Sequence, residues 1–450
     1  MKMKRTNTRI AAAVLTLGLL LTGCGGTGSD TGNTDGSNVV TPDTPRPTSS
    51  VVNLSEKVTK LDIPETPLSE PHGSSLSRSG IALLYQTAAL EEDKNRNLLI
   101  SPYSIQAALG MTATGSDDGS ATEREMMDIL LPGTSEKPEA LNREMASFAA
   151  RMENDPDVSW NVANSIWVNN DGQVKLRDTF ISDATNYYDA ELFSAPMNEE
   201  TRASVNAWVK KETRERIPEI LSKLDPETAL ILINALAFDG EWAEPYEEKS
   251  IREKESFTNA DGSTSEVTML DSKEHCFLEL GGGLGFIRDY KGYQYSFVGI
   301  LPPEGMSTEE YLAKLKKDGS DFSEAFLKRD STRDVYVSLP EFKTEFDICL
   351  DKVLQSLGMK EAYSPDASFR KMVSDDSGSV KISTVIHKTM IDVDRAGTKA
   401  AAATAVVATK NAALPDPAEP VSIILNRPFV YAIVDSTTGV PIFLGTQNSM

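Results

Sequence analysis

Of the residues in this 450-residue chain that could act as a general base or as a nucleophile, the three histidines and three cysteines are few enough to consider singly. His275 stands directly before Cys276, but no third residue nearby is placed to orient such a pair, as nucleophilic catalysis requires. His387 lies in the strand-like run 380–393, where a lone histidine is most often a hydrogen-bonded core residue. His72 falls in a stretch rich in Pro, Gly and Ser. These residues therefore predict no catalytic centre.

The motifs that usually mark an enzyme are missing from the sequence. It has no Gly-x-Ser-x-Gly elbow, no His-Glu-x-x-His and no Gly-x-x-x-x-Gly-Lys-Ser/Thr phosphate loop. The glycine-rich stretch 281–285 shows no strand-to-helix context, so we interpret it as a turn. The cysteines lack metal-ligand spacing and cannot form a disulfide framework, so we expect Cys276 and Cys349 to be buried free thiols. We expect a protein that is not an enzyme and that binds no cofactor and no metal. A hydrolase is the third choice of function, behind two non-enzymatic functions given below, and the sequence does not identify its nucleophile.

The composition restricts the class of protein and the class of partner. The net charge of -22 at pH 7 argues against nucleic acid, anionic membrane surfaces and heparin-like polyanions as partners. The 40% hydrophobic and 25% charged residues are typical of a soluble globular protein, and the chain is long enough to bury a large core.

The first 24 residues have the features of an export signal. A short apolar run, 10–21, follows four basic side chains: Lys2, Lys4, Arg5 and Arg9. The run is too short for a comfortable membrane span. Leu21-Thr-Gly-Cys24 then resembles a bacterial lipobox, which would make Cys24 the lipidated first residue of the mature chain. The alternative is an ordinary signal peptide that contains a cysteine. We expect an extracytoplasmic protein, attached to the membrane only through a lipid on Cys24.

The rest of the chain divides into a stalk and a globular domain. Residues 25–73 are mostly Gly, Ser, Thr, Asp and Pro, which cannot bury a core, so we expect a disordered stalk. In residues 74–450, apolar residues recur at helical spacing early, whereas runs typical of strands prevail late. We expect helices at 81–88, 205–209 and 346–357, and strands at 230–238, 335–339, 421–425, 429–434 and 440–444. This order predicts an α+β fold without strict βαβ alternation.

Residues 394–409 combine opposing structural preferences. Their alanines favour helix or mobile coil, whereas Thr404, Val406, Val407 and Thr409 suit a strand. No position from 397 to 405 is large and apolar, so the segment has little with which to anchor itself. Such a run fits a mobile loop that later becomes a strand in a crowded sheet.

Several ordered motifs resemble those of the serpins, the serine-protease inhibitors that trap proteases by changing shape. The similarity covers residues 75–450 and includes Asn97-Leu-Leu-Ile-Ser-Pro-Tyr-Ser-Ile105, Asn206-Ala-Trp208, Leu232-Ile-Asn-Ala-Leu-Ala-Phe238, Leu339-Pro-Glu-Phe342, Leu357-Gly-Met359, His387-Lys388 and Asn426-Arg-Pro-Phe429. The resemblance implies a monomeric serpin fold with about nine helices, three β-sheets and an exposed reactive loop, about 394–420, near the C-terminus.

The resemblance also implies a mechanism for the segment 394–409. A serine protease attacks the loop and forms an acyl-enzyme, and the loop then inserts as a new strand, so that the tethered protease is distorted before deacylation. Inserting side chains must be small, as are those of the hinge: Gly397, Thr398, Ala400, Ala402 and Thr404. We therefore favour a suicide-type inhibitor of serine proteases, with cysteine proteases as a further class of partner. The alternative is a non-inhibitory binding protein on the same scaffold.

Two further groups of residues are assigned by the resemblance. The shutter, a hydrogen-bonded latch beneath the strands that part, maps to Ser101, Ser104, Asn234 and His387. The breach, where insertion begins, contains Trp242. One departure from the family pattern stands there: Arg395 replaces the usual Glu, and Glu341 replaces the Lys that normally pairs with it. We favour a reversed ion pair over two independent surface charges.

The scissile bond is predicted by counting residues from the hinge. The family's usual count of fourteen residues beyond Gly397 gives Asn411–Ala412, whereas counting back from the motif at 426 points elsewhere. The neighbouring small side chains, Thr409 among them, suit the shallow pocket of elastase-like or subtilisin-like proteases. Lys410 suits a trypsin-like pocket, which is the second choice.

Overall fold

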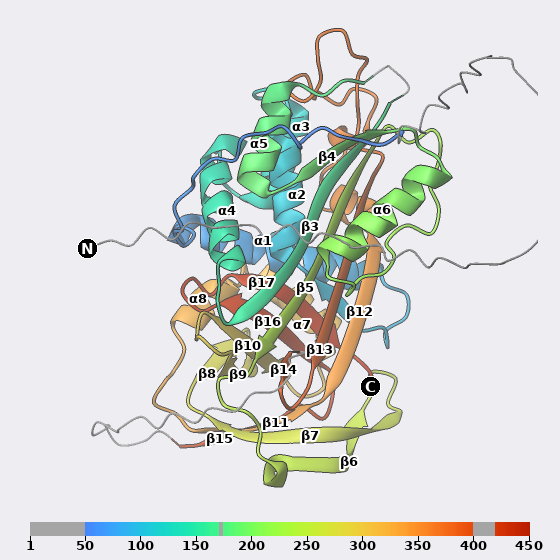
Figure 1. Cartoon of the computed structure of the whole chain (residues 1–450). Coiled ribbons are helices and arrows are strands. Elements are labelled where there is room, and N and C mark those ends of the chain that lie inside the picture. The colour runs from blue at the N-terminus through green and yellow to red at the C-terminus, as the bar shows by residue number, and fades with distance from the viewer. Residues whose placement is uncertain (1–49, 171–173, 399–418) are drawn as a thin grey trace, which may run out of the picture. The chain divides into compact units, whose positions relative to one another are not determined.

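Sheet A, a seven-stranded β-sheet, runs through the centre of the structure (Figure 1). The computed structural model describes residues 50–170, 174–398 and 419–450. Strand β5 (Leu230–Glu241) forms because its almost continuous apolar run is buried on both faces of the sheet. In spatial order the strands of sheet A are β1 (Val52–Asn53), β4 (Glu191–Ala195), β3 (Val158–Asn169), β5, β14 (Gly397–Thr398), β13 (Thr384–Val393) and β12 (Phe342–Cys349).

Two smaller sheets accompany sheet A. Sheet B has six strands, in the order β2 (Leu98–Ile100), β17 (Pro441–Gln447), β16 (Phe429–Asp435), β10 (Tyr295–Leu301), β9 (Gly283–Asp289) and β8 (Phe277–Leu280). Sheet C has four, in the order β15 (Val421–Ile424), β11 (Val335–Pro340), β7 (Thr264–Glu274) and β6 (Ile251–Thr258). β15 follows the expected reactive loop in sequence and pairs in parallel with β11.

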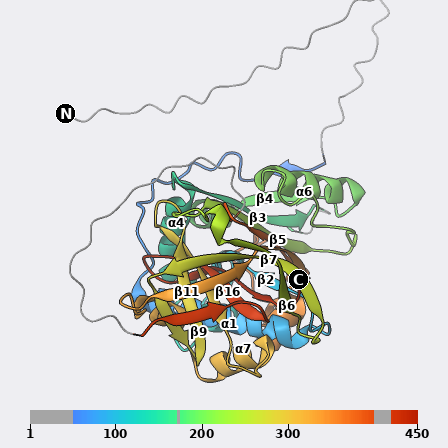
Figure 2. The same cartoon turned by 90° about the horizontal axis from the view of Figure 1, so that it is seen from below.

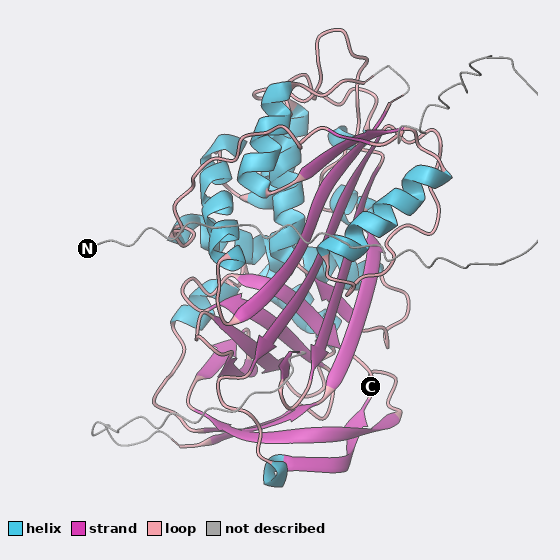
Figure 3. Ribbon diagram, in the orientation of Figure 1, coloured by secondary structure: helices cyan, strands magenta, loops and turns pink. Residues whose placement is uncertain are grey.

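The described residues also form nine α-helices, most of them around the end of sheet A that is remote from sheet C (Figure 3). They are α1 (Glu70–Leu90), α2 (Pro102–Thr114), α3 (Ala121–Leu130), α4 (Pro138–Glu153), α5 (Asp178–Tyr188), α6 (Glu199–Glu212), α7 (Thr308–Lys317), α8 (Phe322–Leu327) and α9 (Asp351–Ser356), with short 3-10 turns at Glu248–Ser250 and Glu361–Tyr363. Figure 2 shows α6 on one side of sheet A, with α1 and α7 on the other. Within the described ranges, no helix has the length and apolar character needed to cross a membrane.

The two faces of sheet A pack against different partners. A small apolar cluster joins α6 to strands β3, β4 and β5 on one face, through Val205, Val209 and Trp167 among others. The main core lies on the other face and includes sheet B and helices α1 and α2. Helix α2 is buried along its whole length, which suits its lack of charged residues. The α+β class, the nine helices and the three sheets expected from the resemblance are thus confirmed.

The boundary expected between stalk and domain at residue 73 is wrong. β1 pairs with β4 at the edge of sheet A, and α1 begins at Glu70, with Leu68 buried just before it. His72 lies within α1 and is buried, between the carboxylates of Glu136 and Glu144. Backbone pairing with β4, hydrogen bonds to α4 and α5 and a few apolar anchors hold residues 50–69 on the domain, and composition reveals none of these.

Two further predictions concern the cysteines and the glycine-rich stretch. Cys349 is exposed rather than buried, because it ends the edge strand β12, and Cys276 is only half-buried. The prediction of two buried thiols is therefore wrong. Gly281 and Gly282 form the turn between β8 and β9, with φ of 56° and 87°, as the turn interpretation requires.

Candidate functional site

β5 and β13 run side by side and parallel in sheet A, and we call their shared edge the seam. The seam pairs residues 231–237 with residues 384–390. Beyond these pairs the strands part, and β14 lies between them. β14 is antiparallel to both: Gly397 pairs with Glu241, and Thr398 pairs with Gly240 and Val393. The first hinge residues therefore already form a short strand at the open end of the seam.

Two glycines allow the hinge to approach β5 closely. A Cβ atom on Gly397 would lie 2.2 Å from the carbonyl oxygen of Gly240, a contact that no side-chain movement could relieve. A Cβ atom on Gly240 would meet the rings of Phe238 and Tyr290 at 2.6 and 3.1 Å. The absence of a side chain at Gly397 is thus required for β14 to pair with β5, and its absence at Gly240 is required by the aromatic rings that pack beside β5.

The turn that leads into β14 is fixed by Trp242 and Asp394. The indole Nε1–H of Trp242 donates to the Asp394 carbonyl at 2.8 Å, and its backbone N–H donates to the Ala396 carbonyl at 3.1 Å. The carboxylate of Asp394 accepts from the N–H groups of Ala396 and Gly397 at 2.7 and 3.1 Å. Trp242, which the resemblance placed at the breach, therefore contacts the hinge directly.

Arg395 and Glu341 form an ion pair beside this turn. Arg395 Nε donates to Glu341 Oε1 at 2.9 Å and a terminal nitrogen donates to Oε2 at 3.2 Å, while the Arg395 backbone N–H adds a third bond of 3.1 Å to Oε1. The hydrogen bond with Glu341 raises the pKa of the Arg395 guanidinium. The charges reversed relative to the family pattern thus meet, and the contact connects the hinge to the segment between β11 and β12.

A buried polar network lies beneath the seam. His387 Nε2 accepts from the backbone N–H of Ser101 at 3.0 Å, and His387 Nδ1 lies 2.7 Å from Asn234 Oδ1. Asn234 also accepts from Ser104 Oγ at 2.6 Å and donates to Asn164 Oδ1 at 2.5 Å. The hydroxyl of Ser101 caps α2 by accepting from the Ser104 N–H. The network links β13 to β5, β3 and the start of α2.

This network requires a neutral histidine. Since Nε2 of His387 accepts from a backbone N–H, the ring proton lies on Nδ1 and is donated to Asn234. Burial lowers the pKa of His387 to about 3, against the smaller opposing effect of its hydrogen bonding to Asn234. A second ring proton would face the Ser101 N–H, donor against donor. The histidine is therefore a hydrogen-bonded core residue, as its isolation in the sequence suggested.

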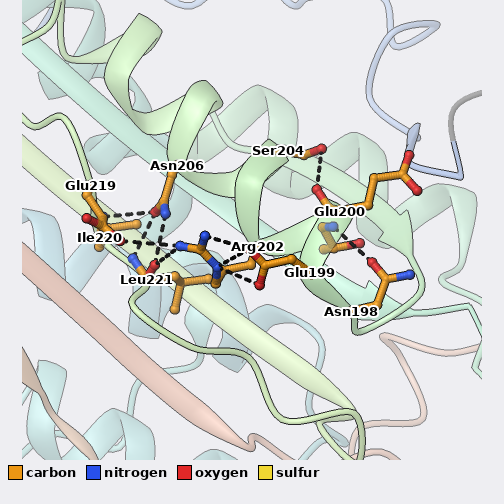
Figure 4. Close-up of polar contacts among 10 residues, drawn as sticks. Asn198, Glu199, Glu200, Arg202, Ser204, Asn206, Glu219, Ile220 and Leu221 are labelled. Carbon is orange, nitrogen blue, oxygen red and sulfur yellow. Dashed lines mark hydrogen bonds and ion pairs between the residues drawn. The ribbon is translucent and has the colours of Figure 1, made fainter.

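Helix α6 and the segment 213–229 cover the outer face of the seam, and we call them the cover. Figure 4 shows how the segment is attached to the helix: Arg202 donates to the Leu221 carbonyl at 2.9 Å, and the amide oxygen of Asn206 accepts from the Ile220 and Leu221 N–H groups. Arg216 pairs with Asp239 on β5. On the other side of the seam, Lys388 Nζ donates to the Glu219 carbonyl at 2.9 Å. The cover therefore bridges both strands of the seam.

The structure brings most of the sequence-predicted residues together around the seam. The four shutter residues form one network beneath the seam. At the open end of the seam lie the breach and hinge residues Trp242, Glu341, Arg395, Gly397 and Thr398. Cys24, Ala400, Ala402, Thr404, Thr409, Lys410, Asn411 and Ala412 lie outside the described residues. In the part that the structure does describe, no three His, Cys, Asp or Glu side chains are grouped so that they could hold a metal ion.

Sequence reasoning missed two residues of the site. Asn164 on β3 completes the amide pair with Asn234, and its position opposite Asn234 in the sheet register follows only from the β3–β5 pairing. Tyr290, which follows β9, lies with its hydroxyl 2.6 Å from the Thr398 hydroxyl. No motif marks either residue, and both come from strands distant in sequence from the hinge.

Comparisons with known proteins agree with this geometry. The family model described as "Serpin (serine protease inhibitor)" matches residues 77–450. Serpin-Z2A of Triticum aestivum is 30% identical over 383 residues, which cover 82% of this chain and 94% of that protein. The native-state crystal structure of tengpin, a thermophilic serpin, is similar with a TM-score of 0.78 and 36% identity, covering 89% of this chain and all of that one. The latent-state structure of tengpin gives a TM-score of 0.70. The chain belongs to the serpin family.

Proposed function

We propose that this chain inhibits serine proteases by inserting its reactive loop into sheet A after the loop is attacked. The observation that carries the proposal is the position of β14. Gly397 and Thr398 already lie between β5 and β13, antiparallel to both, at the one end of the seam where these strands have parted. A chain that continued from Thr398 along the seam would add a full strand in the same orientation.

Insertion exchanges one parallel ladder for two antiparallel ladders. Neighbouring strands lie about 4.8 Å apart, so β5 and β13 must separate by about that distance to admit a new strand. The pairs between residues 231–237 and 384–390 are lost, together with the bond between His387 and Asn234. The new strand gains hydrogen bonds on both sides, and antiparallel ladders are slightly more stable per residue than parallel ones. The exchange supplies a driving force for trapping an acyl-enzyme.

The target is proposed from residues outside the described part of the chain. The count from Gly397 gives Asn411–Ala412 as the scissile bond, and the small side chains around it suit an elastase-like or subtilisin-like protease. Cleavage after Lys410 by a trypsin-like protease is the second choice. Mass spectrometry of the C-terminal peptide released on complex formation decides between them. A peptide that starts at Ala412 supports the first choice, and one that starts at Asn411 supports the second.

The proposed setting is the outside of a bacterial membrane. The basic and apolar segments before Leu21-Thr-Gly-Cys24 support a lipid on Cys24 that anchors the mature protein outside the cytoplasm. Labelling of cells with radioactive palmitate tests this setting. Incorporation into the wild-type chain, with none into Cys24→Ser, is the expected result; equal labelling of both would contradict a lipid on Cys24.

The inhibitory function is tested on denaturing gels. The purified protein is mixed with elastase-like, subtilisin-like and trypsin-like proteases, and a stable adduct of the two chains is expected with at least one of them. An adduct that disappears when the protease nucleophile is blocked beforehand identifies an acyl complex. Cleavage of the chain by every protease without an adduct would favour the non-inhibitory alternative.

A further inference from the structure

We propose that Tyr290 is the positioning residue for the first step of loop insertion, because its hydroxyl is hydrogen-bonded to the hydroxyl of Thr398. The two oxygens lie 2.6 Å apart, and both side chains are fully buried. Thr398 is the second residue of β14 and one of the hinge residues of the expected reactive loop. The inference rests on the proposed function, and it names the group that holds the hinge where insertion starts.

The surroundings of Tyr290 hold its ring in one orientation. The ring stacks on the indole of Trp242, with centroids 4.7 Å apart and planes 11° from parallel. Phe238 meets it edge-on at 4.8 Å, on the side where Gly240 leaves no side chain. The backbone of Tyr290 is fixed by a hydrogen bond of 3.0 Å to the Tyr295 carbonyl and by a bridge to Trp242. The hydroxyl is therefore held at a fixed point beside the hinge.

Burial makes the hinge position beside Tyr290 selective for a side chain with a hydroxyl group. A hydroxyl group removed from water costs free energy unless it finds a hydrogen-bond partner, and the cost applies to both oxygens here. Burial raises the pKa of Tyr290 far above its ordinary value, so the phenol stays neutral and can either donate or accept. A hinge residue with a small hydroxyl side chain satisfies both oxygens, whereas an aliphatic residue of the same size leaves the phenol unpaired.

The contact has a kinetic consequence for inhibition. After the loop is cut, insertion competes with hydrolysis of the acyl-enzyme, and slow insertion releases a cleaved chain and active protease. A hinge whose first two residues are already paired in sheet A has less conformational freedom to lose when the rest of the loop inserts along the seam. Loss of the Tyr290–Thr398 contact is therefore expected to shift the outcome from trapping toward release.

The test uses the full-length protein and three variants that change few atoms. Tyr290→Phe removes the phenol oxygen and keeps the ring packing, and Thr398→Val replaces the hydroxyl partner with a side chain of the same shape. Tyr295→Phe is the matched control, because it removes another buried tyrosine hydroxyl, one that has no hydrogen bond to the hinge. Thermal melting confirms that each variant is folded; Thr398→Val keeps the test valid if Tyr290→Phe does not fold.

Two readouts separate this inference from the proposed function. The first readout is hydrogen exchange at the amides of residues 396–398, which needs no protease. Tyr290→Phe and Thr398→Val are each expected to speed this exchange about tenfold, and the double variant is expected to speed it no more than either single variant. Tyr295→Phe is expected to leave the exchange rate unchanged. The second is the number of inhibitor molecules consumed per protease, expected to rise severalfold in the same two variants. Unchanged exchange and unchanged stoichiometry in Tyr290→Phe would overturn the inference while inhibition stands. Faster exchange in a protein that traps no protease would instead overturn the proposed function and leave the docking contact established.

Discussion

Arg395 binds Glu341 through three hydrogen bonds, two from its side chain and one from its backbone N–H, at the point where the hinge enters sheet A. Neither residue is fully buried: the side chains are 43% and 23% exposed. The pair therefore contributes through its geometry, since it holds a residue of the turn 394–397 to Glu341, directly before β12. The negative charges of Glu248 and Glu253 also act on the Arg395 guanidinium.

The first prediction concerns the direction of this ion pair. Arg395→Glu or Glu341→Arg places like charges in contact and should weaken the closure of the sheet by about 0.2–1 kcal/mol for the lost exposed pair, with repulsion added. Each single variant is expected to polymerise faster on mild heating. The double exchange restores opposite charges and should return the polymerisation rate, measured by native gels, close to wild type. A double variant that polymerises as fast as the singles would show that the pairing does not close the sheet.

The second prediction concerns pH and His387. The unfolded chain binds a proton at this residue below about pH 6.5, whereas the folded chain binds it only near pH 3. Since the unfolded state binds more protons in this window, stability falls as the pH drops through it, by about 1.4 kcal/mol per unit once well below pH 6.5. Denaturant unfolding at pH 7 and pH 5 is expected to show the loss.

His72 provides the control for the pH experiment. Its hydrogen bonds to Glu136 and Glu144 outweigh burial and raise its pKa, so it contributes stability that is present at low pH and lost as the pH rises. His72→Gln removes this opposing contribution and should make the loss between pH 7 and pH 5 larger. If His72→Gln instead abolished the pH dependence, the titration would belong to His72 and the assignment to His387 would be wrong.

The sequence predicted the residues of the seam better than the contacts that hold it. The apolar run of β5, the small hinge residues and the Ser101–Ser104 motif are local patterns, so the resemblance identified them. Tyr290 and Asn164 join the site through strand pairings between distant segments, and no local pattern records those. The expected stalk boundary is wrong for a similar reason: residues 52–54 are attached by backbone hydrogen bonds to β4, and residues 60–69 by hydrogen bonds to α4 and α5, whereas the composition alone is that of a flexible chain.

The third prediction concerns Lys388 and the cover. The cover is tied to β5 through Arg216 and Asp239, so separation of β13 from β5 stretches the bond from Lys388 to the Glu219 carbonyl. Lys388→Met removes that bond, worth about 0.5–1.5 kcal/mol, from the closed state alone. Loop insertion at saturating protease, followed by stopped-flow fluorescence, should then be a few-fold faster. Lys381→Met, at an exposed position just before β13, should leave the rate unchanged. Equal rates for Lys388→Met and wild type would mean that the cover does not resist opening.

The last prediction concerns the stability of the cleaved chain. If the loop enters the seam after cleavage, it acquires hydrogen bonds to both β5 and β13. A central strand of about ten residues makes about twenty ladder hydrogen bonds, while the parallel pairs of residues 231–237 with 384–390 are lost. At about 1 kcal/mol net for each bond, the difference is on the order of 10 kcal/mol. Cleavage within residues 405–418 by a protease that is not trapped should therefore raise the melting temperature sharply. Thr398→Arg supplies the control, because Thr398 is fully buried beside Tyr290 and an unpaired guanidinium there would cost several kcal/mol. The cut variant should melt close to its uncut form, and it should behave as a substrate toward proteases that the wild type traps. An unchanged melting temperature for the cut wild type would mean that the seam does not accept the loop, because a nicked chain that stays outside the sheet gains no new ladder.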